Sequence, residues 1–447
     1  MRTWIRNPLA ILADEDAAGG FVVDGARIAE CLPAGAVPVA PCERVFDASE
    51  HVVLPGLVNT HHHFYQTLTR AHGPALGKEL FDWLKALYPV WAGLTADRLD
   101  AATRLALAEL LLSGCTTAAD HHYVFPAGLE HAIDVQAAAA RDLGVRVTLT
   151  RGSMNLSVAD GGLPPESVVQ DADTIFADSE RVIDAFHEPG DGAFVQIALA
   201  PCSPFSVTPG IMRDTARLAA QRGVRLHTHL GETRDENAFC EGRFGCRPLD
   251  YLEEAGWLTD RTWLAHGIHF TAEEIARLGR AGTAVAHCPG SNMVLASGLC
   301  PAMDLAAARV PVGIGVDGSA SEDASNLMQE VRQALQVQRL RYGAARVGHL
   351  DVLRWATAGS AACLGRDDIG RIAPGKQADL ALFKLDEPRF SGAGDPLAAL
   401  VLCGAHRADR VMVGGAWRVR DGEVVDLDLE ALMVRHREAA RSLALAA

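Results

Sequence analysis

Apolar runs that end in polar residues, each followed by a segment with helical spacing of its apolar positions, recur from residue 52 to residue 317. A strand buried on both faces reads as such a run, so the pattern predicts parallel strands covered by helices. The eight predicted strands are Val52–His63, Thr116–His122, Val145–Arg151, Phe194–Ser203, Val224–Glu232, Thr262–His266, Thr283–Pro289 and Val312–Asp317. Their number predicts an α/β fold, a closed (β/α)8 barrel of the TIM type.

The segments between these strands have the apolar stripes of helices. Thr103–Leu112 is apolar over a wide face, and Ile211–Arg222 has one clear stripe. Crossover connections of this length suit parallel strands.

Short alternating runs with Gly and Pro between them occupy both ends of the chain. They are Gly20–Val23, Arg27–Ile28, Ala378–Phe383, Arg410–Val413 and Trp417–Val419. We expect residues 1–54 and 370–447 to form one small, discontinuous, β-sandwich-like domain beside a barrel of residues 55–369. A helix at about Leu429–Leu443 is expected to cap the small domain.

The composition fits an enzyme-sized chain with a small-molecule partner. Its 447 residues are 49% hydrophobic, and 41 Lys and Arg face 56 Asp and Glu, for a net charge of −15. This charge argues against non-specific binding to nucleic acid or an anionic membrane. Acidic residues interrupt the N-terminal segment, and no apolar run is long enough to span a bilayer, so we expect a cytoplasmic protein. A homo-oligomer is possible by analogy with related enzymes.

The ten cysteines form no CxxC pair and lie mostly in apolar runs. In the cytoplasm this usage predicts buried thiols rather than disulfides.

Histidines and carboxylates follow several of the predicted strands, at the end where barrel enzymes place their active sites. His61 and His63 alternate, so both can face one metal ion while His62 faces outward. Alone, this pair could equally be structural. A single His or an Asp before Gly usually serves packing or a turn.

Other strands bring further groups to the same rim: His229 and Glu232, His266, and Asp317. Burying several imidazoles with two carboxylates is costly without a cation. An imidazole-rich site with one carboxylate suits Zn²⁺, with Fe²⁺ or Mn²⁺ as alternatives.

Six segments together resemble the amidohydrolase superfamily, and within it the aminohydrolases that release ammonia from purine, pyrimidine and related rings. They are Pro55–His63, His227–Glu232, Leu264–His266, His287–Asn292, Gly315–Ser319 and Gly370–Leu380. The resemblance implies one metal ion per subunit, with His61, His63, His229 and Asp317 as its ligands. It also implies that Glu232 carries protons and that His266 orients or polarises the attacking water.

Dinuclear members of that superfamily place a carboxylated Lys at the end of strand four. Here that end reads Pro201-Cys202-Ser203-Pro204, so a single metal is expected. This argues against dihydroorotase-like or urease-like chemistry.

The charges suggest a mechanism. The metal makes hydroxide available near neutral pH, and hydroxide attacks the ring carbon that bears the amine. Asp317, helped by His266, accepts the water proton, and Glu232 protonates the neighbouring ring nitrogen.

The substrate is inferred from the resemblance and from side-chain chemistry. Gln66 and Arg151 match residues that hold the amide edge of a purine in guanine deaminase-like enzymes, and both can pair with that edge. For Arg151 an ordinary ion pair is an equal alternative. Trp91, His122 and Tyr123 are pocket candidates by position, with plain packing as the alternative.

Within the group, four runs resemble those of deaminases that convert 8-oxoguanine to urate: Asn59–Arg70, Ala119–Tyr123, Ala198–Pro209 and Gly315–Asn326. Gly290 stands where Ser is expected, and Glu322 where Asn is expected. An amino-substituted oxopurine, 8-oxoguanine, is therefore the expected substrate. Isoxanthopterin, isocytosine and guanine remain alternatives, as do chloride or amine release from an s-triazine and a non-catalytic scaffold.

Overall fold

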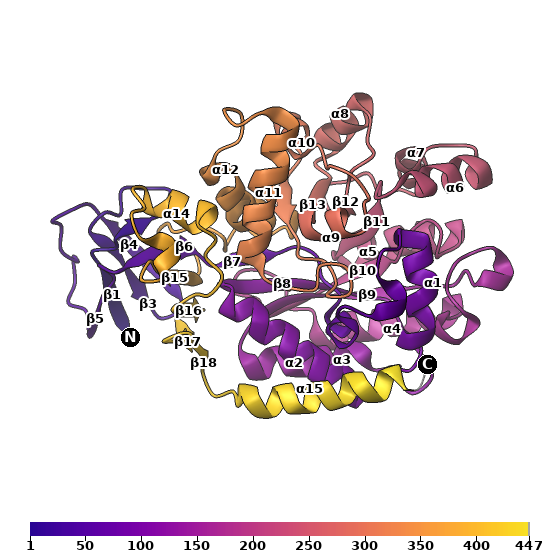
Figure 1. The fold of residues 1–447 in the computed structure, drawn as a ribbon, viewed down its shortest axis with the longest axis horizontal. Helices are drawn as coiled ribbons and strands as arrows, with labels where there is room; N and C mark the ends of the chain where they lie inside the picture. The colour runs from indigo at the N-terminus through magenta and orange to yellow at the C-terminus, as the bar shows by residue number, and fades with distance from the viewer. Residues whose placement is uncertain (446–447) are drawn as a thin grey trace.

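Eight parallel strands form a closed barrel at the centre of the molecule (Figure 1). The computed structural model describes residues 1–445. The barrel strands are β7 (Leu57–Asn59), β8 (Cys115–His122), β9 (Arg146–Ser153), β10 (Val195–Pro201), β11 (Arg225–Leu230), β12 (Thr262–His266), β13 (Ala284–His287) and β14 (Val312–Ile314). β14 pairs with β7 and closes the ring, so the predicted (β/α)8 fold is confirmed.

The first predicted strand is in fact two strands. The chain runs through β6 (His51–Pro55) in the small domain, passes Gly56 and enters the barrel as β7. A Cβ atom at Gly56 would lie 2.2 Å from the side-chain oxygen of Thr116, so only glycine fits at this crossing. His61 and His63 therefore follow the strand in a loop instead of ending it.

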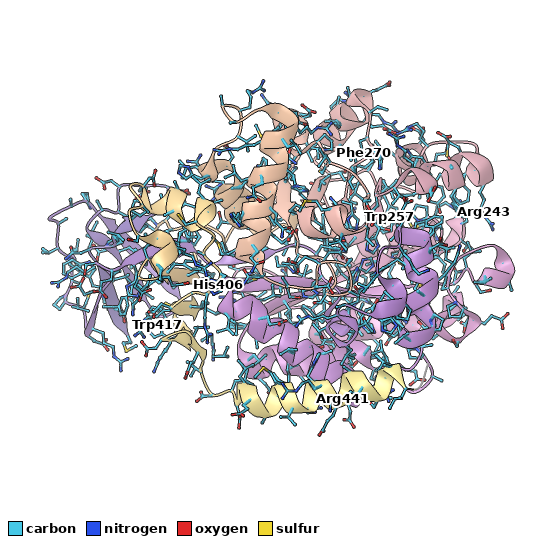
Figure 2. The ribbon with its side chains drawn as sticks, viewed as in Figure 1. Arg243, Trp257, Phe270, His406, Trp417 and Arg441 are labelled. Atoms are coloured by element: carbon cyan, nitrogen blue, oxygen red, sulfur yellow. The ribbon has the colours of Figure 1, made fainter. Side chains whose placement is uncertain are left out.

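Helices surround the barrel, most of them on its outer side, while α1 and α9 lie at the pocket end (Figure 1). They are α1 (Leu80–Trp91), α2 (Ala96–Leu112), α3 (Ala132–Leu143), α4 (Ala172–Phe186), α5 (Pro209–Arg222), α6 (Arg234–Phe244), α7 (Pro248–Glu254), α8 (Ala272–Ala281), α9 (Pro289–Val294), α10 (Ala302–Ala307), α11 (Leu327–Tyr342), α12 (His349–Arg354) and α13 (Ser360–Cys363). Their ends carry local signals: α8 begins with a capping box of Thr271 and Glu274 and ends at Gly282 in the left-handed conformation. Trp257, just after α7, is fully buried beside this helical layer (Figure 2).

Two sheets form the small domain, and both ends of the chain contribute to it. One contains β1 (Arg2–Arg6), β3 (Gly20–Asp24), β4 (Arg27–Leu32) and β5 (Arg44–Asp47); the other contains β2 (Ala10–Ile11), β6, β15 (Leu380–Lys384), β16 (Arg410–Val413), β17 (Ala416–Arg420) and β18 (Glu423–Val424). Ile5 and Phe21 of the first sheet share an apolar core with Val53 and Leu382 of the second. α14 (Pro396–Leu402) lies in the connection between β15 and β16.

A buried ion pair joins the small domain to the barrel. Arg146 on β9 donates from Nε to Asp379, next to β15, over 2.8 Å, and both side chains are about 1% exposed. Asp379 also accepts from the backbone N–H of Gly414. Removing either charge would leave the other buried without a partner, so this ion pair stabilises one relative arrangement of the small domain and the barrel.

The last helix, α15 (Leu429–Ala444), does not cap the small domain, contrary to the expectation from the sequence. It runs along α2 on the barrel, with Arg441 near its far end (Figures 1 and 2). Arg435 pairs with Asp100 of α2, and His436 contacts Thr67. A helix buries its apolar stripe on whichever surface is complementary, and here that surface is α2.

All ten cysteines, which lie in the described part of the chain, are free. No helix among the described residues is both long and apolar enough to cross a membrane.

Candidate active site

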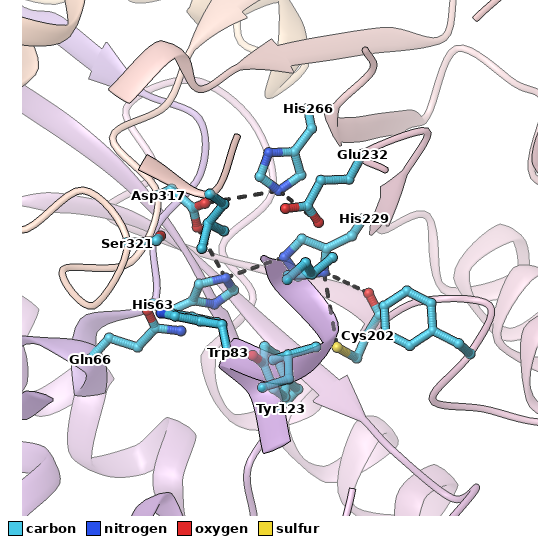
Figure 3. A pocket seen from close by; sticks show the side chains of 14 residues that line it. His63, Gln66, Trp83, Tyr123, Cys202, His229, Glu232, His266, Asp317 and Ser321 are labelled. Atoms are coloured by element: carbon cyan, nitrogen blue, oxygen red, sulfur yellow. Dashed lines mark hydrogen bonds and ion pairs between the residues drawn. The ribbon is translucent and has the colours of Figure 1, made fainter. Parts of the chain in front are cut away.

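A pocket opens where the barrel strands end, and it gathers most of the predicted catalytic groups (Figure 3). Its lining includes His63, His229, Glu232, His266 and Asp317. All are buried, because the loops that follow the strands fold over them. Barrel enzymes keep their chemistry at this end of the strands.

Three histidines are oriented by bonds to their Nδ1 atoms. His63 and His229 each place Nδ1 2.7 Å from a backbone carbonyl, that of His121 and that of Cys202 respectively. Nδ1 of His61 lies 2.8 Å from Nε2 of His227. In each ring Nε2 is left to face the centre of the barrel mouth, as in metal-binding histidines whose second nitrogen is hydrogen-bonded.

Nε2 of His61 and Nε2 of His63 lie against Asp317, and Nε2 of His229 lies against His63. Oδ1 of Asp317 lies 3.2 Å from Nε2 of His61 and 3.3 Å from Nε2 of His63. Nε2 of His229 lies 3.3 Å from Nε2 of His63, and Nε2 of His61 is buried without a hydrogen-bond partner. Nitrogen atoms this close, around one carboxylate, fit a divalent cation between them.

Burial sets the protonation states in this cluster. It lowers the pKa of His61 and His229 well below the usual range, so both rings are neutral and carry free lone pairs. Burial opposes ionisation of Asp317, but His61 and His63 outweigh it and hold the pKa of Asp317 well below normal. Neutral His61 and His229 beside one carboxylate anion are donors that transition metals prefer.

His266 and Asp317 both adopt the left-handed backbone conformation, with φ of 71° and 66°. This conformation is costly for residues other than glycine, and such strain is concentrated at functional sites. The left-handed conformation turns the side chains of His266 and Asp317 toward the pocket. His266 is the last residue of β12, and Asp317 follows shortly after β14. Nε2 of His266 then lies 3.9 Å from Oδ2 of Asp317.

Asn292 fixes the ring of His266. Nδ1 of His266 lies 3.0 Å from Oδ1 of Asn292, a side-chain oxygen that accepts the Nδ1 proton. Nε2 therefore faces the pocket as an acceptor, 3.5 Å from Oε2 of Glu232. Asn292 lies in one of the motifs that carry the family resemblance, but nothing in the sequence pattern indicates that it holds His266.

Glu232 is held protonated by its surroundings. Burial and the nearby charge of Asp317 raise its pKa well above the usual range, against a smaller lowering effect of His63. Its backbone N–H donates to Glu236 over 2.9 Å. A buried, protonated carboxyl beside the metal ligands can donate a proton to a bound ring.

Two further histidines surround the cluster. His121 stacks on His229 with ring centroids 4.7 Å apart, and His227 stacks on Trp263 at 4.3 Å. His121 also lies close enough to His61 and His229 for the three to share an ion. Strand alternation could have found His227, which lies two residues before His229 and so on the same face.

Of the four residues predicted to bind substrate, the pocket contains Gln66. Its Oε1 is buried without a hydrogen-bond partner. A Cβ atom at Gly318 would lie 1.8 Å from that oxygen, so the glycine makes room for the amide. Gln66 thus presents an unused acceptor beside the catalytic groups. Tyr123, another predicted pocket candidate, also lines the cavity.

Arg151 lies outside the pocket lining, so the structure does not support the contact with substrate that was expected for it. Nε of Arg151 donates to Asp178 on α4 over 2.7 Å, and its Nη2 donates to Gln170. Its guanidinium also lies 4.0 Å from the ring centroid of Phe125. The side chain points from β9 toward the helical layer, so the alternative of an ordinary ion pair fits the structure.

His122 and Trp91 also lie outside the pocket lining. His122 packs edge-on against Tyr65 and Phe125. Trp91 packs against Tyr65 and donates from its indole N–H to Thr69. Both are packing residues here, in line with the alternative left open for them.

The remaining walls of the pocket are mostly apolar or aromatic, and the sequence did not single them out. They are Leu80, Trp83, Leu84, Cys202, Phe205, Leu295 and Ser321. Trp83 and Cys202 are drawn with the catalytic groups in Figure 3. Apolar walls with a few convergent polar groups are typical of pockets that bind small molecules.

The fold and the metal-type cluster define a barrel hydrolase, and the chain belongs to the amidohydrolase family. The model of this family, described as "Amidohydrolase family", matches residues 52–418. The match contains the barrel and every residue of the cluster.

Individual proteins extend the similarity over nearly the whole chain. An 8-oxoguanine deaminase of Pseudomonas aeruginosa is 68% identical over 444 residues, covering 99% of each chain. An isoxanthopterin deaminase from an unknown prokaryotic organism is 34% identical over 92% of this chain and 89% of its own. The crystal structure of an atrazine chlorohydrolase from Arthrobacter aurescens, complexed with zinc, is 32% identical with a TM-score of 0.92, covering 98% of this chain and 100% of its own.

Proposed function

We propose that this protein is a metal-dependent deaminase that hydrolyses 8-oxoguanine to urate and ammonia. One observation carries the chemistry: Nε2 of His61 and Nε2 of His63 lie against Asp317, Nε2 of His229 lies 3.3 Å from Nε2 of His63, and protonated Glu232 is beside them. The 68% identity to an 8-oxoguanine deaminase supports the choice of substrate.

His61, His63, His229 and Asp317 would hold the ion. Zn²⁺ is the proposed metal, because imidazole nitrogen with one carboxylate suits it and a related barrel is known with zinc. When bound, such an ion lowers the pKa of water so that a hydroxide nucleophile is available near pH 7.

Asp317 and His266 handle the proton of the attacking water. Oδ2 of Asp317 lies 3.9 Å from Nε2 of His266, so one water oxygen beside them can hydrogen-bond to both. Asp317 accepts the proton, and His266 orients the nucleophile through the lone pair that its bond to Asn292 leaves free. The left-handed backbone at both residues keeps these two atoms aimed at one point.

Glu232 protonates the ring nitrogen next to the carbon under attack. Without this proton, attack would build negative charge on an electron-rich ring. The raised pKa of Glu232 keeps the proton in place at neutral pH until the substrate needs it. Ammonia then leaves with the proton that Asp317 accepted.

Gln66 and the aromatic walls position the ring. The unpartnered Oε1 of Gln66 accepts from a ring N–H, while Trp83 and Phe205 bound the slot in which the ring lies. The described pocket lining contains no Arg or Lys, so it favours a neutral heterocycle over a phosphorylated nucleotide.

The test is ammonia release by zinc-loaded protein from 8-oxoguanine, guanine, isoxanthopterin and isocytosine, compared as kcat/KM. The expected result is a clear preference for 8-oxoguanine. A preference for isoxanthopterin would keep the mechanism and overturn the substrate. A chlorinated s-triazine completes the panel: chloride release without ammonia release from any purine would overturn the assignment as a deaminase.

A further inference from the structure

A second pocket lies at the opposite, N-terminal end of the barrel. Thr148, Gln196 and Arg225 come from the first residues of β9, β10 and β11, and Arg261 directly precedes β12. His187, just after α4, completes the polar lining. The pocket has a volume of about 240 Å³.

The pocket is basic. It contains two arginines, and none of the described residues that line it is acidic. No ion pair joins Arg225 or Arg261 to a carboxylate among residues 1–445, and Nε of each is buried without a hydrogen-bond partner. This contrasts with the chain as a whole, whose net charge is −15. Both arginines are partly buried and neither pairs with a carboxylate, so an anion in this pocket would gain two charge-assisted contacts.

Arg225 is held in place rather than free to turn away. Its Nη2 donates to the carbonyls of Asp260 and Cys363, over 3.1 and 2.8 Å. A Cβ atom at Gly365 would lie 2.5 Å from its Nη1, and Gly365 has a φ of 67° that favours glycine. Burial lowers the pKa of Arg225 to about 10, opposed by Cys363 and Asp260 and helped slightly by Arg261, so the side chain is still charged at neutral pH.

Uncharged donors stand beside the arginines. The hydroxyl oxygen of Thr148 is buried without a partner. Nδ1 of His187 accepts from the backbone N–H of Ile197 over 3.1 Å, which leaves Nε2–H as the donor of that ring. Arg225, held in place, and Arg261, whose side chain is free to bind a ligand, lie beside a hydroxyl and an imidazole N–H, and this set matches a tetrahedral oxyanion, which offers acceptors in several directions.

We propose that this pocket binds a small tetrahedral oxyanion of the phosphate type. The bound anion would be shared by Arg225 and Arg261 and would join β9, β10 and β11 to the segment before β12. The site lies at the other end of the barrel from the catalytic pocket, and it does not depend on the chemistry proposed there.

The experiment measures binding of inorganic phosphate to the zinc-loaded protein by calorimetry, with thermal unfolding in phosphate and in chloride at equal ionic strength. We expect saturable binding and a Tm that rises by a few degrees with phosphate over chloride, since a ligand of the folded state stabilises it. Arg261→Gln should raise the Kd for phosphate about tenfold or more, the loss expected for one charge-assisted hydrogen bond. Because the side chain of Arg261 makes no hydrogen bond in the described structure, this variant should fold normally.

Arg222→Gln is the matched control. It removes a nearby cation that pairs with Asp184 outside the pocket, and it should leave phosphate binding unchanged. Equal Tm in phosphate and chloride would overturn the proposal. So would phosphate binding that survives Arg261→Gln and competes with substrate, because that binding would belong to the catalytic pocket. Tighter binding of malonate than of phosphate through the same arginines would overturn the tetrahedral class.

Discussion

A Cβ atom at Gly290 would lie 2.8 Å from Cγ of Glu322, and 2.4 Å from Oε1 of Glu330. The two positions at which this chain departs from the pattern of 8-oxoguanine deaminases are therefore in contact. Glu322 occupies space that a side chain at residue 290 would need, so the Gly at 290 and the Glu at 322 depend on each other. Glu322 directly follows Ser321, which lines the pocket.

Gly290→Ser should therefore destabilise the protein by about 1–3 kcal/mol, the usual cost of overfilling a packed site. Adding Glu322→Asn, which shortens the competing side chain, should restore part of the loss. Urea unfolding of the two single variants and the double variant gives the coupling energy. Gly242→Ser on α6 is the control, because nothing lies within 4 Å of its Cβ position. Strict additivity of the two single changes would contradict the coupling.

The buried acids near Gly290 should make stability depend on pH. Burial raises the pKa of Glu330 to about 8, and the hydrogen bond from the Gly290 N–H lowers this pKa by a smaller amount. Burial and the charge of Glu330 raise the pKa of Glu322. Between pH 4.5, the ordinary value, and pH 8, the folded chain holds a proton that the unfolded chain releases. The free energy of unfolding should therefore fall as pH rises through this window.

Glu330→Gln should flatten that dependence, since the amide can still accept from Gly290 but does not titrate. The expected difference from wild type between pH 5 and pH 9 exceeds about 1 kcal/mol, because one pKa unit is worth about 1.4 kcal/mol. Urea unfolding at several pH values measures it, with exposed Glu438→Gln as the control. Parallel pH curves for wild type and Glu330→Gln would show that Glu330 does not carry the effect.

Glu232→Gln should keep the metal and lose turnover. The amide fills the same space but cannot supply a proton, so kcat should fall by a factor of about 10² to 10⁴. His229→Ala should instead lose the metal, because it removes one of the converging nitrogens. Metal content and ammonia release, measured on both variants, distinguish the two roles. A near-normal kcat in Glu232→Gln would show that another group protonates the ring.

Asn292→Ala should lower kcat about tenfold with little change in KM. The substitution removes the acceptor that holds the His266 ring, and positioning bonds of this kind are worth about 10-fold or more in activity. Asn292→Asp keeps an acceptor oxygen and should lose less. If both variants lost only stability and kept kcat, Asn292 would be a structural residue alone.

Arg151→Met should lower stability and leave KM unchanged. It removes the fully buried partner of Asp178, which is 15% exposed and keeps its ion pair with Arg181, so the expected cost is about 1.5–3 kcal/mol, that of hydrogen bonds to a charged group. Gln66→Ala is the complementary variant, because Gln66 lines the pocket, and it should raise KM with a smaller effect on stability. A rise in KM with Arg151→Met at unchanged stability would show that Arg151 contacts the substrate.

The amino-acid sequence by itself was sufficient to predict the barrel and the rim of catalytic residues. Apolar runs mark strands buried on both faces, and the polar residues that end them must gather at one end of a parallel barrel. His63, His229, Glu232, His266 and Asp317 could be placed together for this reason.

The tertiary structure decided which way side chains point and what the outer elements cover. A strand buried on both faces has no polar side, so its pattern does not say which residues face the barrel interior. Arg151 and His122 are paired neighbours on β9 and β8, and both pack against Phe125, outside the pocket lining. The surface under α15 and the contact between Gly290 and Glu322 likewise depend on segments far apart in the chain, which meet only when the barrel closes.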